Sequence, residues 1–259
     1  MPDRLAGINE KIRRAKQHVN DLESAIRVFL DRQPYRIVSE EQPETGKKLY
    51  RVRVAEQPPK SWATFIGDAV HNLRSALDHL AWQLVEAGGG MPGDQTAFPV
   101  GNDVKSLESE LARRVHGAHP EAVDAIRRLQ PYKGGNGDLL WRLHRLDIYD
   151  KHRLLLAIGA AYRHFALKVK MELPWKPGQL VEAPTIKIKP ADRQFPLEDD
   201  AIVLSTSMDD EAAKIGYQFT FEVAFSDGEV VQGEPIMATL RQLVVFVESA
   251  IDPFRPFLT

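Results

Sequence analysis

The sequence predicts an α+β fold: a helical bundle module with an inserted β-hairpin, followed by an antiparallel β-sheet and a C-terminal helix. Apolar residues recur with the helical period of 3.6 over most of residues 1–160, and the period changes to 2 after Gly159. Runs of helices followed by runs of strands favour an antiparallel sheet. We expect a helical module over 1–160, with the hairpin at about 35–55, and the sheet with its helix over 161–259. The two parts are expected to pack as one compact unit.

Two different spacings predict the first helix and the hairpin. Between Ile8 and Phe29 the apolar residues are separated by four and three positions in turn, which places them on one stripe of a helix that Pro34 ends. Apolar and polar residues then alternate over 35–38 and 50–54, on either side of a turn at 43–46. The stripe consists of Ile8, Ile12, Ala15, Val19, Leu22, Ile26 and Phe29.

Glycines and prolines delimit the remaining helices. Three glycines at 88–90 end a long amphipathic segment, and Pro120 suits the first position of a helix. Asp138 follows a glycine-rich turn and is a good N-cap residue. We therefore expect helices at about 60–87, 103–115, 120–130, 138–159 and 235–251.

Strands are expected wherever apolar residues alternate with polar ones after Gly159. The clearest run lies between Tyr217 and Phe225, and Asp227–Gly228 then supplies a hairpin turn into Val230 and Val231. Shorter alternating runs occur at 165–171, 186–189 and 202–204.

The composition excludes several classes of protein. The 259 residues carry 34 basic and 36 acidic side chains and are 43% apolar, which is too apolar for a disordered chain and too evenly charged for a non-specific nucleic-acid coat. The absence of cysteine excludes disulfides, thiolate metal sites and cysteine nucleophiles. Neither a signal-peptide core nor an apolar run of about 18 residues is present, so we expect a cytoplasmic protein without membrane contact.

Two of the expected helices carry more ionisable residues than a solvated face needs. In the 60–87 helix, one face is apolar and the other is rich in His, Arg and Asp, which suit a partly desolvated polar site. The 138–159 helix is apolar almost all the way round, so its ionisable residues should be partly buried and need partners. The polar residues are His71, Arg74, Ser75, Asp78 and His79 in the first helix, and His144, Asp147, Asp150, Lys151 and His152 in the second.

The two segments share a spacing that bears on how they pair. His71 and His79 are eight residues apart, and so are His144 and His152. Three residues after the first histidine the two helices carry Arg74 and Asp147, and seven residues after it they carry Asp78 and Lys151, so the charges at matched positions are opposite. Parallel helices would pair Arg74 with Asp147 and Asp78 with Lys151, whereas a simple up-and-down path would make them antiparallel and break this pairing. In either arrangement we expect the two polar faces to converge.

The first two interpretations of this cluster are a structural network and a metal site. In a structural network, Arg74 bridges Asp78 one turn along and the histidines are hydrogen-bonded in the core. Imidazole and carboxylate groups also suit zinc, manganese or iron, although histidines eight apart on a helix are less convenient than the i, i+4 spacing. The metal alternative would use His71, His79, His144 and Asp147, with Asp78 as a further ligand.

The third interpretation is catalytic and rests on a resemblance. The segment Arg74-Ser-Ala-Leu-Asp-His79 resembles the Arg-x4–6-His motif of HEPN (higher eukaryotes and prokaryotes nucleotide-binding) domains. In that family the residue after the arginine is often Asn, Asp or His, whereas this chain has Ser75. The segments HNLRSALDHLAW and LHRLDIYDKHR are also similar to segments of uncharacterised bacterial proteins.

The resemblance to HEPN domains implies a metal-independent endoribonuclease whose motifs meet across a homodimer. Arg74 would hold the scissile phosphate and His79 would be the general acid and base for attack by the RNA 2′-hydroxyl. The supporting residues would be His71, Ser75, Asp78, His144, Asp147 and His152. RNA is then the expected partner, and no cofactor is needed.

Fainter signals lie elsewhere in the chain. The glycine-rich loop at 133–138 could offer N–H groups to a phosphate, but it lacks the Lys-Ser/Thr of a P-loop and a simple connection is the alternative. No Gly-x-Ser-x-Gly elbow accompanies Ser75 and His79, which argues against a hydrolase triad. Lysines could line one sheet face that tracks a nucleic acid, or could be merely solvated: Lys168, Lys170, Lys187 and Lys189, joined by Arg51 and Arg53.

Two functions are therefore expected. The first is an RNA-cleaving or RNA-binding protein that acts through Arg74 and His79. The alternative is a non-enzymatic ligand-binding or interaction protein whose His, Arg and Asp cluster is a structural core network.

Overall fold

The computed structural model confirms the α+β class and describes residues 3–167, 170–172, 180–182, 186–188, 196–209, 218–226 and 230–258. The chain divides into two units, each built from separate segments. The first contains residues 1–25, 60–156 and 227–259, and the second contains residues 26–59 and 157–226. This differs from the expected sequential division at residue 160, because the hairpin groups with the later strands and the C-terminal helix groups with the earlier helices.

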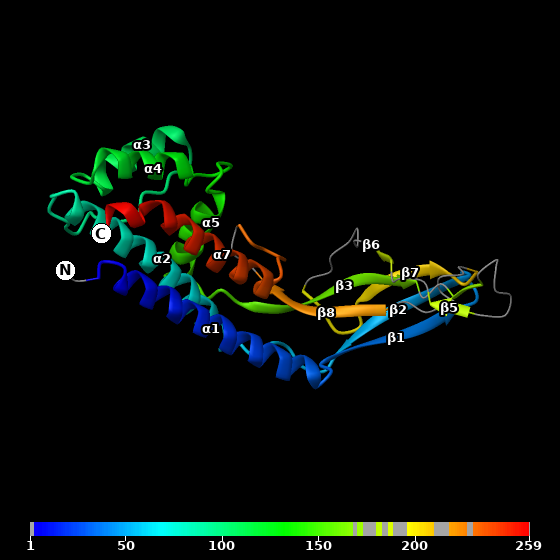
Figure 1. Cartoon of the computed structure of the whole chain (residues 1–259). Coiled ribbons are helices and arrows are strands. Elements are labelled where there is room, and N and C mark those ends of the chain that lie inside the picture. The colour runs from blue at the N-terminus through cyan, green and yellow to red at the C-terminus, as the bar shows by residue number, and fades with distance from the viewer. Residues whose placement is uncertain are drawn as a thin grey trace. The chain divides into compact units, whose positions relative to one another are not determined.

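The first unit is helical (Figure 1). Its 3-10 helix η1 (Asp252–Phe257) continues directly from α7. Its α-helices are α1 (Ala6–Asp31), of which residues 6–25 belong to this unit, α2 (Trp62–Ala87), α3 (Val104–Arg114), α4 (Pro120–Leu129), α5 (Asp138–Asp150) and α7 (Ile236–Ile251). Among the described helices, none combines the length and the apolarity that crossing a membrane requires.

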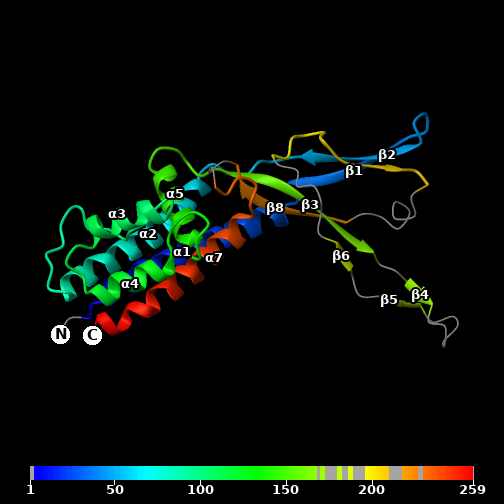
Figure 2. The same cartoon turned by 90° about the horizontal axis from the view of Figure 1, so that it is seen from above.

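Ion pairs show the directions of the long helices. Arg4 lies 2.6 Å from Glu86, so the beginning of α1 meets the end of α2. Lys16 lies 2.6 Å from Glu248 near the end of α7, and Glu23, further along α1, pairs with Arg241 near the beginning of α7. Helix α1 is therefore antiparallel to α2 and α7, beside which it lies in both views (Figures 1 and 2).

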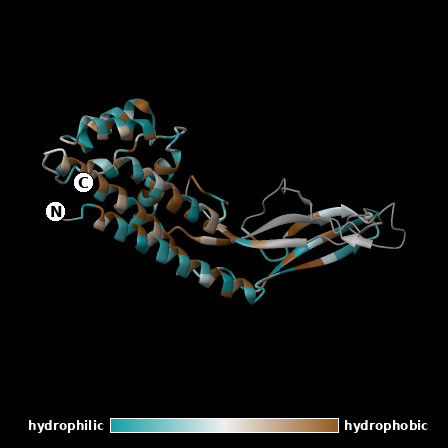
Figure 3. Ribbon diagram, viewed as in Figure 1, coloured by the Kyte–Doolittle hydropathy of each residue, from teal (hydrophilic) through white to brown (hydrophobic). Residues whose placement is uncertain are grey.

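The core of the first unit follows from the apolar stripes. Every residue of the stripe from Ile8 to Phe29 is buried, as its spacing predicted, and its members up to Leu22 belong to this unit, while brown and teal alternate along α1 (Figure 3). In α2 the buried positions include Leu73, Leu77, Leu80 and Leu84, which lie three or four residues apart on one face. This pattern leaves the opposite side of α2 available for polar residues.

The loops after α2 and α3 approach each other at glycines. A Cβ added to Gly117, whose φ is +92°, would lie 2.8 Å from the Cα of Gly90, and one added to Gly88 would lie 2.4 Å from the Gly117 carbonyl oxygen. Only residues without a side chain permit this backbone contact.

The second unit consists of antiparallel strands. The expected hairpin is β1 (Tyr35–Gln42) with β2 (Lys47–Val54), in the register Tyr35 opposite Val54, and β7 (Ile202–Ser207) extends it in the order β1-β2-β7. A second sheet has the order β6-β3-β8, from β3 (Ala157–Leu167), β6 (Ile186–Ile188) and β8 (Gln218–Phe225), and β4 (Lys170–Glu172) pairs with β5 (Leu180–Glu182).

An aromatic contact packs the interior of the second unit. The ring of Tyr35 lies 5.3 Å from that of Phe221 and 5.9 Å from that of Phe29. A Cβ at Gly159 would lie 2.4 Å from the Tyr35 hydroxyl, so β3 can pass the tyrosine at this position only because it carries no side chain.

Three expectations about the elements were wrong. The helix expected to reach about residue 159 ends at Asp150, because residues 157–159 pair with 223–225 of β8. Asp138 is the first helical residue and Gly137 is the N-cap. Val230 and Val231 form bends instead of a strand. The turn expected at residues 227–228 lies outside the described residues.

The lysines expected on one sheet face do not share one sheet. Lys170 belongs to β4 and Lys187 to β6, which are in different sheets, while Lys168 and Lys189 lie outside the described residues. Arg53 of β2 is 2.9 Å from Asp200, and this pair compensates its charge within the unit. The described strands therefore do not form the cationic face that the sequence suggested.

Candidate functional site

Helices α2 and α5 bring most of the expected polar residues together, and they run antiparallel. His71 Nδ1 lies 3.1 Å from Asp147 Oδ1, and Gly67, one turn earlier in α2, faces Asp150, which follows later in α5. The pairing of Arg74 with Asp147 and of Asp78 with Lys151 is therefore wrong, because it required parallel helices. The up-and-down path of the chain decides the direction.

Arg74 is the most buried cation of this site, with 5% of its surface exposed. Its Nη2 donates to Asp78 Oδ1 at 2.5 Å and to the Phe98 carbonyl oxygen at 2.9 Å, and the Phe98 N–H donates to the same Asp78 oxygen at 2.9 Å. The i, i+4 bridge that the structural interpretation expected is thus present and is tied to the loop before α3. Arg74 Nη1 is buried and has no hydrogen-bond partner among the described residues.

Asp147 connects a second set of groups. Its side chain is 4% exposed, one oxygen lies beside His71, and the other accepts a hydrogen bond from Lys151 Nζ at 2.6 Å. On the far side of the imidazole, Ser75 Oγ lies 3.4 Å from His71 Nε2. Serine, imidazole and carboxylate are therefore connected in series, with the imidazole exposed and the carboxylate buried.

Two ionisable groups of α5 have shifted pKa values. Burial, and after it the nearby charge of Arg74, lowers the pKa of His144 to about 4, so the imidazole is neutral at pH 7. Its Nδ1 is buried without a hydrogen-bond partner among the described residues. Burial and the charges of Asp147 and Asp68 raise the pKa of Asp150, which packs so closely on α2 that a Cβ at Gly67 would lie 2.3 Å from its carboxylate.

These groups surround a pocket of about 380 Å³, here named the Arg74 pocket. Four cationic side chains and three carboxylates line it, which leaves one positive charge in excess beside the neutral His144. Its lining residues are Arg74, Asp78, Ala97, Phe98, Val100, Glu110, Arg113, Arg114, His144, Asp147 and Lys151.

Sequence reasoning missed the contribution of α3 to this pocket. Arg113 and Arg114 both pair with Glu110, at 2.5 and 2.9 Å, and occupy the last turn of α3, where cations are favourable. Nothing in their local sequence distinguishes them from ordinary surface residues. Only the long-range packing of α3 brings them to the site.

His79 and His152 lie apart from the Arg74 pocket. His79 is exposed and lines a different pocket of about 430 Å³, together with Trp82, Gln83 and Thr96, and of the described residues only Asp78 borders both pockets. Five residues turn a helix by about 140°, so Arg74 and His79 lie on different sides of α2. His152 is exposed beyond the end of α5.

The described histidines and carboxylates do not form a metal site. Within the part of the chain that the structure describes, no three His, Cys, Asp or Glu side chains are grouped so that they could hold an ion. Because His79 lies apart from His71 and His144, it cannot bind the same metal ion as they would in the expected metal site.

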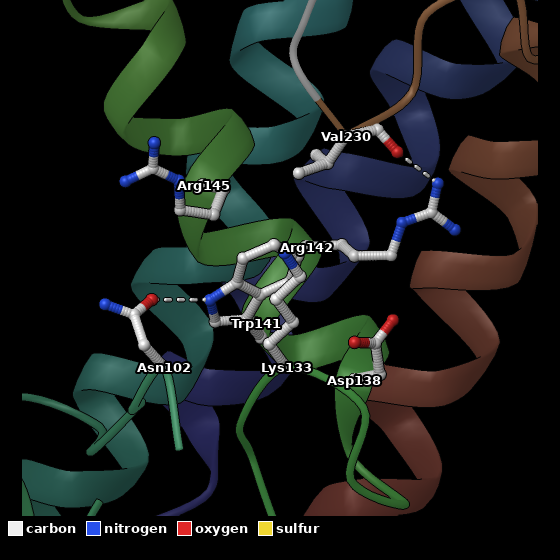
Figure 4. A pocket seen from close by; sticks show the side chains of 7 residues that line it. All are labelled: Asn102, Lys133, Asp138, Trp141, Arg142, Arg145 and Val230. Carbon is white, nitrogen blue, oxygen red and sulfur yellow. Dashed lines mark hydrogen bonds between the residues drawn. The ribbon is translucent and has the colours of Figure 1, made fainter. Parts of the chain in front are cut away.

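A further pocket, of about 590 Å³, lies beside the beginning of α5 (Figure 4). Trp141 Nε1 donates to Asn102 Oδ1 at 3.0 Å, and Lys133 Nζ lies 5.5 Å from the indole ring. The Gly134 N–H donates a hydrogen bond to Asp138 Oδ1 at 2.8 Å. This N–H group is therefore not available to bind a phosphate. The simple connection is therefore the better interpretation of this loop.

No family model, no curated protein and no solved structure matches this chain. The chemistry of the site itself is what remains to indicate a function.

Proposed function

We propose that this protein binds a small anion, or the anionic group of a larger ligand, in the Arg74 pocket. The observation that carries the proposal is the buried guanidinium of Arg74, which uses Nη2 for Asp78 and Phe98 and has no described partner at Nη1. A buried donor without a partner costs about 1–3 kcal/mol, which an acceptor oxygen of a ligand would recover.

The charge of the pocket supports an anionic ligand. The four cations exceed the three carboxylates by one, and His144 can add a second positive charge when a bound anion opposes the desolvation that keeps it neutral. The pocket volume of about 380 Å³ is within the range of small-molecule sites. Sulfate, phosphate and carboxylate groups all match this chemistry.

The test is calorimetric titration of the full chain with sodium sulfate, compared with sodium chloride at equal ionic strength. Arg113→Gln removes a cation of the pocket, and Arg13→Gln is its control, because each arginine pairs with a glutamate three residues earlier and Arg13 lies on the exposed face of α1. We expect saturable sulfate binding that Arg113→Gln weakens about tenfold and Arg13→Gln leaves unchanged. Equal binding by both variants, or no saturable binding by the wild type, would overturn the proposal.

The second candidate is RNA binding or cleavage through Arg74 and His79. Its support is the pocket of His79, where Trp82 is 43% exposed and offers an aromatic ring on which a base can stack. A homodimer would be needed if the two motifs act together, as in the HEPN domains that the segment resembles.

An RNA-cleavage assay in EDTA tests this second candidate. Wild type is compared with His79→Ala and with His119→Ala, which removes another exposed histidine outside both pockets. Cleavage that only His79→Ala abolishes would support it, and light scattering would show whether the active species is a dimer. Absence of cleavage in the wild type, or equal cleavage by all three proteins, would remove it.

A further inference from the structure

We infer that Ser75, His71 and Asp147 form a nucleophilic relay, in which Ser75 Oγ is acylated by activated esters. This activity goes beyond anion binding, although Asp147 also lines the Arg74 pocket. The inference rests on how the three side chains are connected and on which of them a substrate can reach.

The connectivity of the imidazole is that of a general base. Ser75 Oγ lies 3.4 Å from His71 Nε2, and the other ring nitrogen, Nδ1, lies 3.1 Å from Asp147 Oδ1. The carboxylate can only accept, so the Nδ1–H donates to Asp147 and leaves the lone pair of Nε2 for the proton of Ser75. The serine-to-imidazole distance is long, as is common before a substrate is bound.

The imidazole is exposed and the serine is half-buried, while the carboxylate that orients the imidazole is buried. The side chain of Asp147 is 4% exposed and that of His71 is 56% exposed, while Ser75 is half-buried. The second oxygen of Asp147 accepts from Lys151 Nζ at 2.6 Å, which fixes the orientation of the carboxylate. A substrate can therefore reach the serine and the imidazole, while the group that orients the imidazole is shielded from water.

The antiparallel packing of α2 and α5 creates this arrangement. His71 precedes Ser75 by one turn of α2, so the two side chains lie on the same face. His79 lies one turn from Ser75 in the other direction, but it lines the pocket of Trp82. Only α5 supplies the carboxylate, because its direction places Asp147 beside His71.

The reaction needs no cofactor. Ser75 Oγ forms a bond to the carbonyl carbon of the ester and passes its proton to His71 Nε2, and the imidazolium is stabilised by Asp147. The ester C–O bond then breaks, and the leaving alcohol or phenol takes the proton from Nε2. Water attacks the acyl-serine, gives a proton to Nε2, and the carboxylic acid leaves as Ser75 Oγ regains that proton.

The position of Ser75 restricts the substrates. Ser75 stands in the middle of α2, where the backbone N–H groups donate to carbonyls four residues earlier and are not available to an oxyanion. Removing a single oxyanion donor typically costs about 10²–10³ in rate. We therefore expect reaction with aryl esters and fluorophosphonates, which have good leaving groups, and none with peptide amides.

The test is covalent labelling of the full chain with a fluorophosphonate probe, followed by mass spectrometry of the peptides. We expect one adduct, on Ser75, that forms on the order of 100-fold more slowly in His71→Gln, which removes the general base. Ser75→Ala should abolish the adduct. Ser109→Ala, which removes an exposed helical serine whose hydroxyl donates to the Lys105 carbonyl, should not change the labelling.

Asp147 is a positioning residue, and its test needs a readout besides rate. In Asp147→Asn, ¹⁵N spectra should show loss of the Nδ1–H tautomer of His71, with slower labelling of Ser75. No adduct on Ser75 of the wild type, or equal labelling rates in the wild type and His71→Gln, would overturn the inference. Arg113→Gln should label normally, so failure of sulfate binding and failure of the relay are distinguishable.

Discussion

Arg74 donates from Nη2 to Asp78 Oδ1 across one turn of α2, and the same carboxylate oxygen accepts the N–H of Phe98. One aspartate therefore holds the buried guanidinium and the loop before α3 in place together. Asp78 thus joins Arg74, four residues before it, to Phe98, twenty residues after it.

Loss of Arg74 should destabilise the first unit. Arg74→Ala removes a buried charged hydrogen-bond donor, so we expect the free energy of unfolding to fall by about 1.5–3 kcal/mol in urea titrations. Arg13→Ala breaks a fully exposed pair with Glu10 and should leave the free energy of unfolding nearly unchanged. Similar losses in the two variants would contradict the role of Arg74.

Gly67 should be intolerant of a side chain. A Cβ there would lie 2.3 Å from Asp150 Oδ2, so Gly67→Ala must displace this carboxylate and should lower the free energy of unfolding by about 1 kcal/mol, after the gain in helix propensity is subtracted. Gly93→Ala is the control, because nothing lies within 4 Å of a Cβ at that position. If the clash is the cause, Gly67→Ala should cost less in an Asp150→Ala background, as a double-mutant cycle would measure.

Asp150 should make the protein less stable as pH rises. Its pKa is raised in the folded protein, so its contribution is fully present below the unfolded value of 3.8 and is lost as pH rises through the folded pKa. Asp150→Asn removes the charge and should raise the melting temperature relative to wild type more at pH 7 than at pH 3.5. A difference that is the same at both pH values would show that burial of the charge is not responsible.

His144 should make the protein less stable as pH falls. Its pKa falls from 6.5 to about 4 on folding, so the unfolded chain binds the proton more readily and stability declines as pH drops through this interval. Arg74, Arg145 and Lys151 oppose its protonation and Asp147 favours it. Urea titrations at pH 7 and pH 4.5 should show a smaller decline in His144→Gln than in wild type.

Bound sulfate should reverse part of this effect on His144. An anion in the Arg74 pocket favours the protonated imidazole, so the pKa of His144 should rise when sulfate is added, as NMR titration of its ring protons would show. Sulfate does not titrate in this range, so its affinity should increase as pH falls from 7 toward 5. An unchanged pKa would place any sulfate binding elsewhere.

The helices were largely predictable because their signals are local. The stripe from Ile8 to Phe29 has one period and one buried face, and all of its members are buried. The end of α5 was not predictable, since the apolar run after Asp150 suits either a helix or a strand and its pairing with β8 decides the outcome. A partner more than sixty residues away gives no signal in that segment.

The candidate site was predictable in its residues but not in its connections. Ionisable side chains on otherwise apolar helices identified α2 and α5, because burial requires such groups to have partners. The direction of the helices, the Phe98 carbonyl and the arginines of α3 depend on loop paths that the sequence pattern does not encode. The polar side of α2 was predicted as one continuous face, but it is wide enough for Arg74 and His79 to line two different pockets.

Helix α7 packs against α2 and α5, although about ninety residues separate it from the end of α5 and most of them belong to the other unit. During synthesis on the ribosome, the apolar surfaces of α2 and α5 emerge long before the segment that covers them. The nascent chain must therefore keep this surface from aggregating, or have a chaperone shield it, until residues 236–251 have left the exit tunnel.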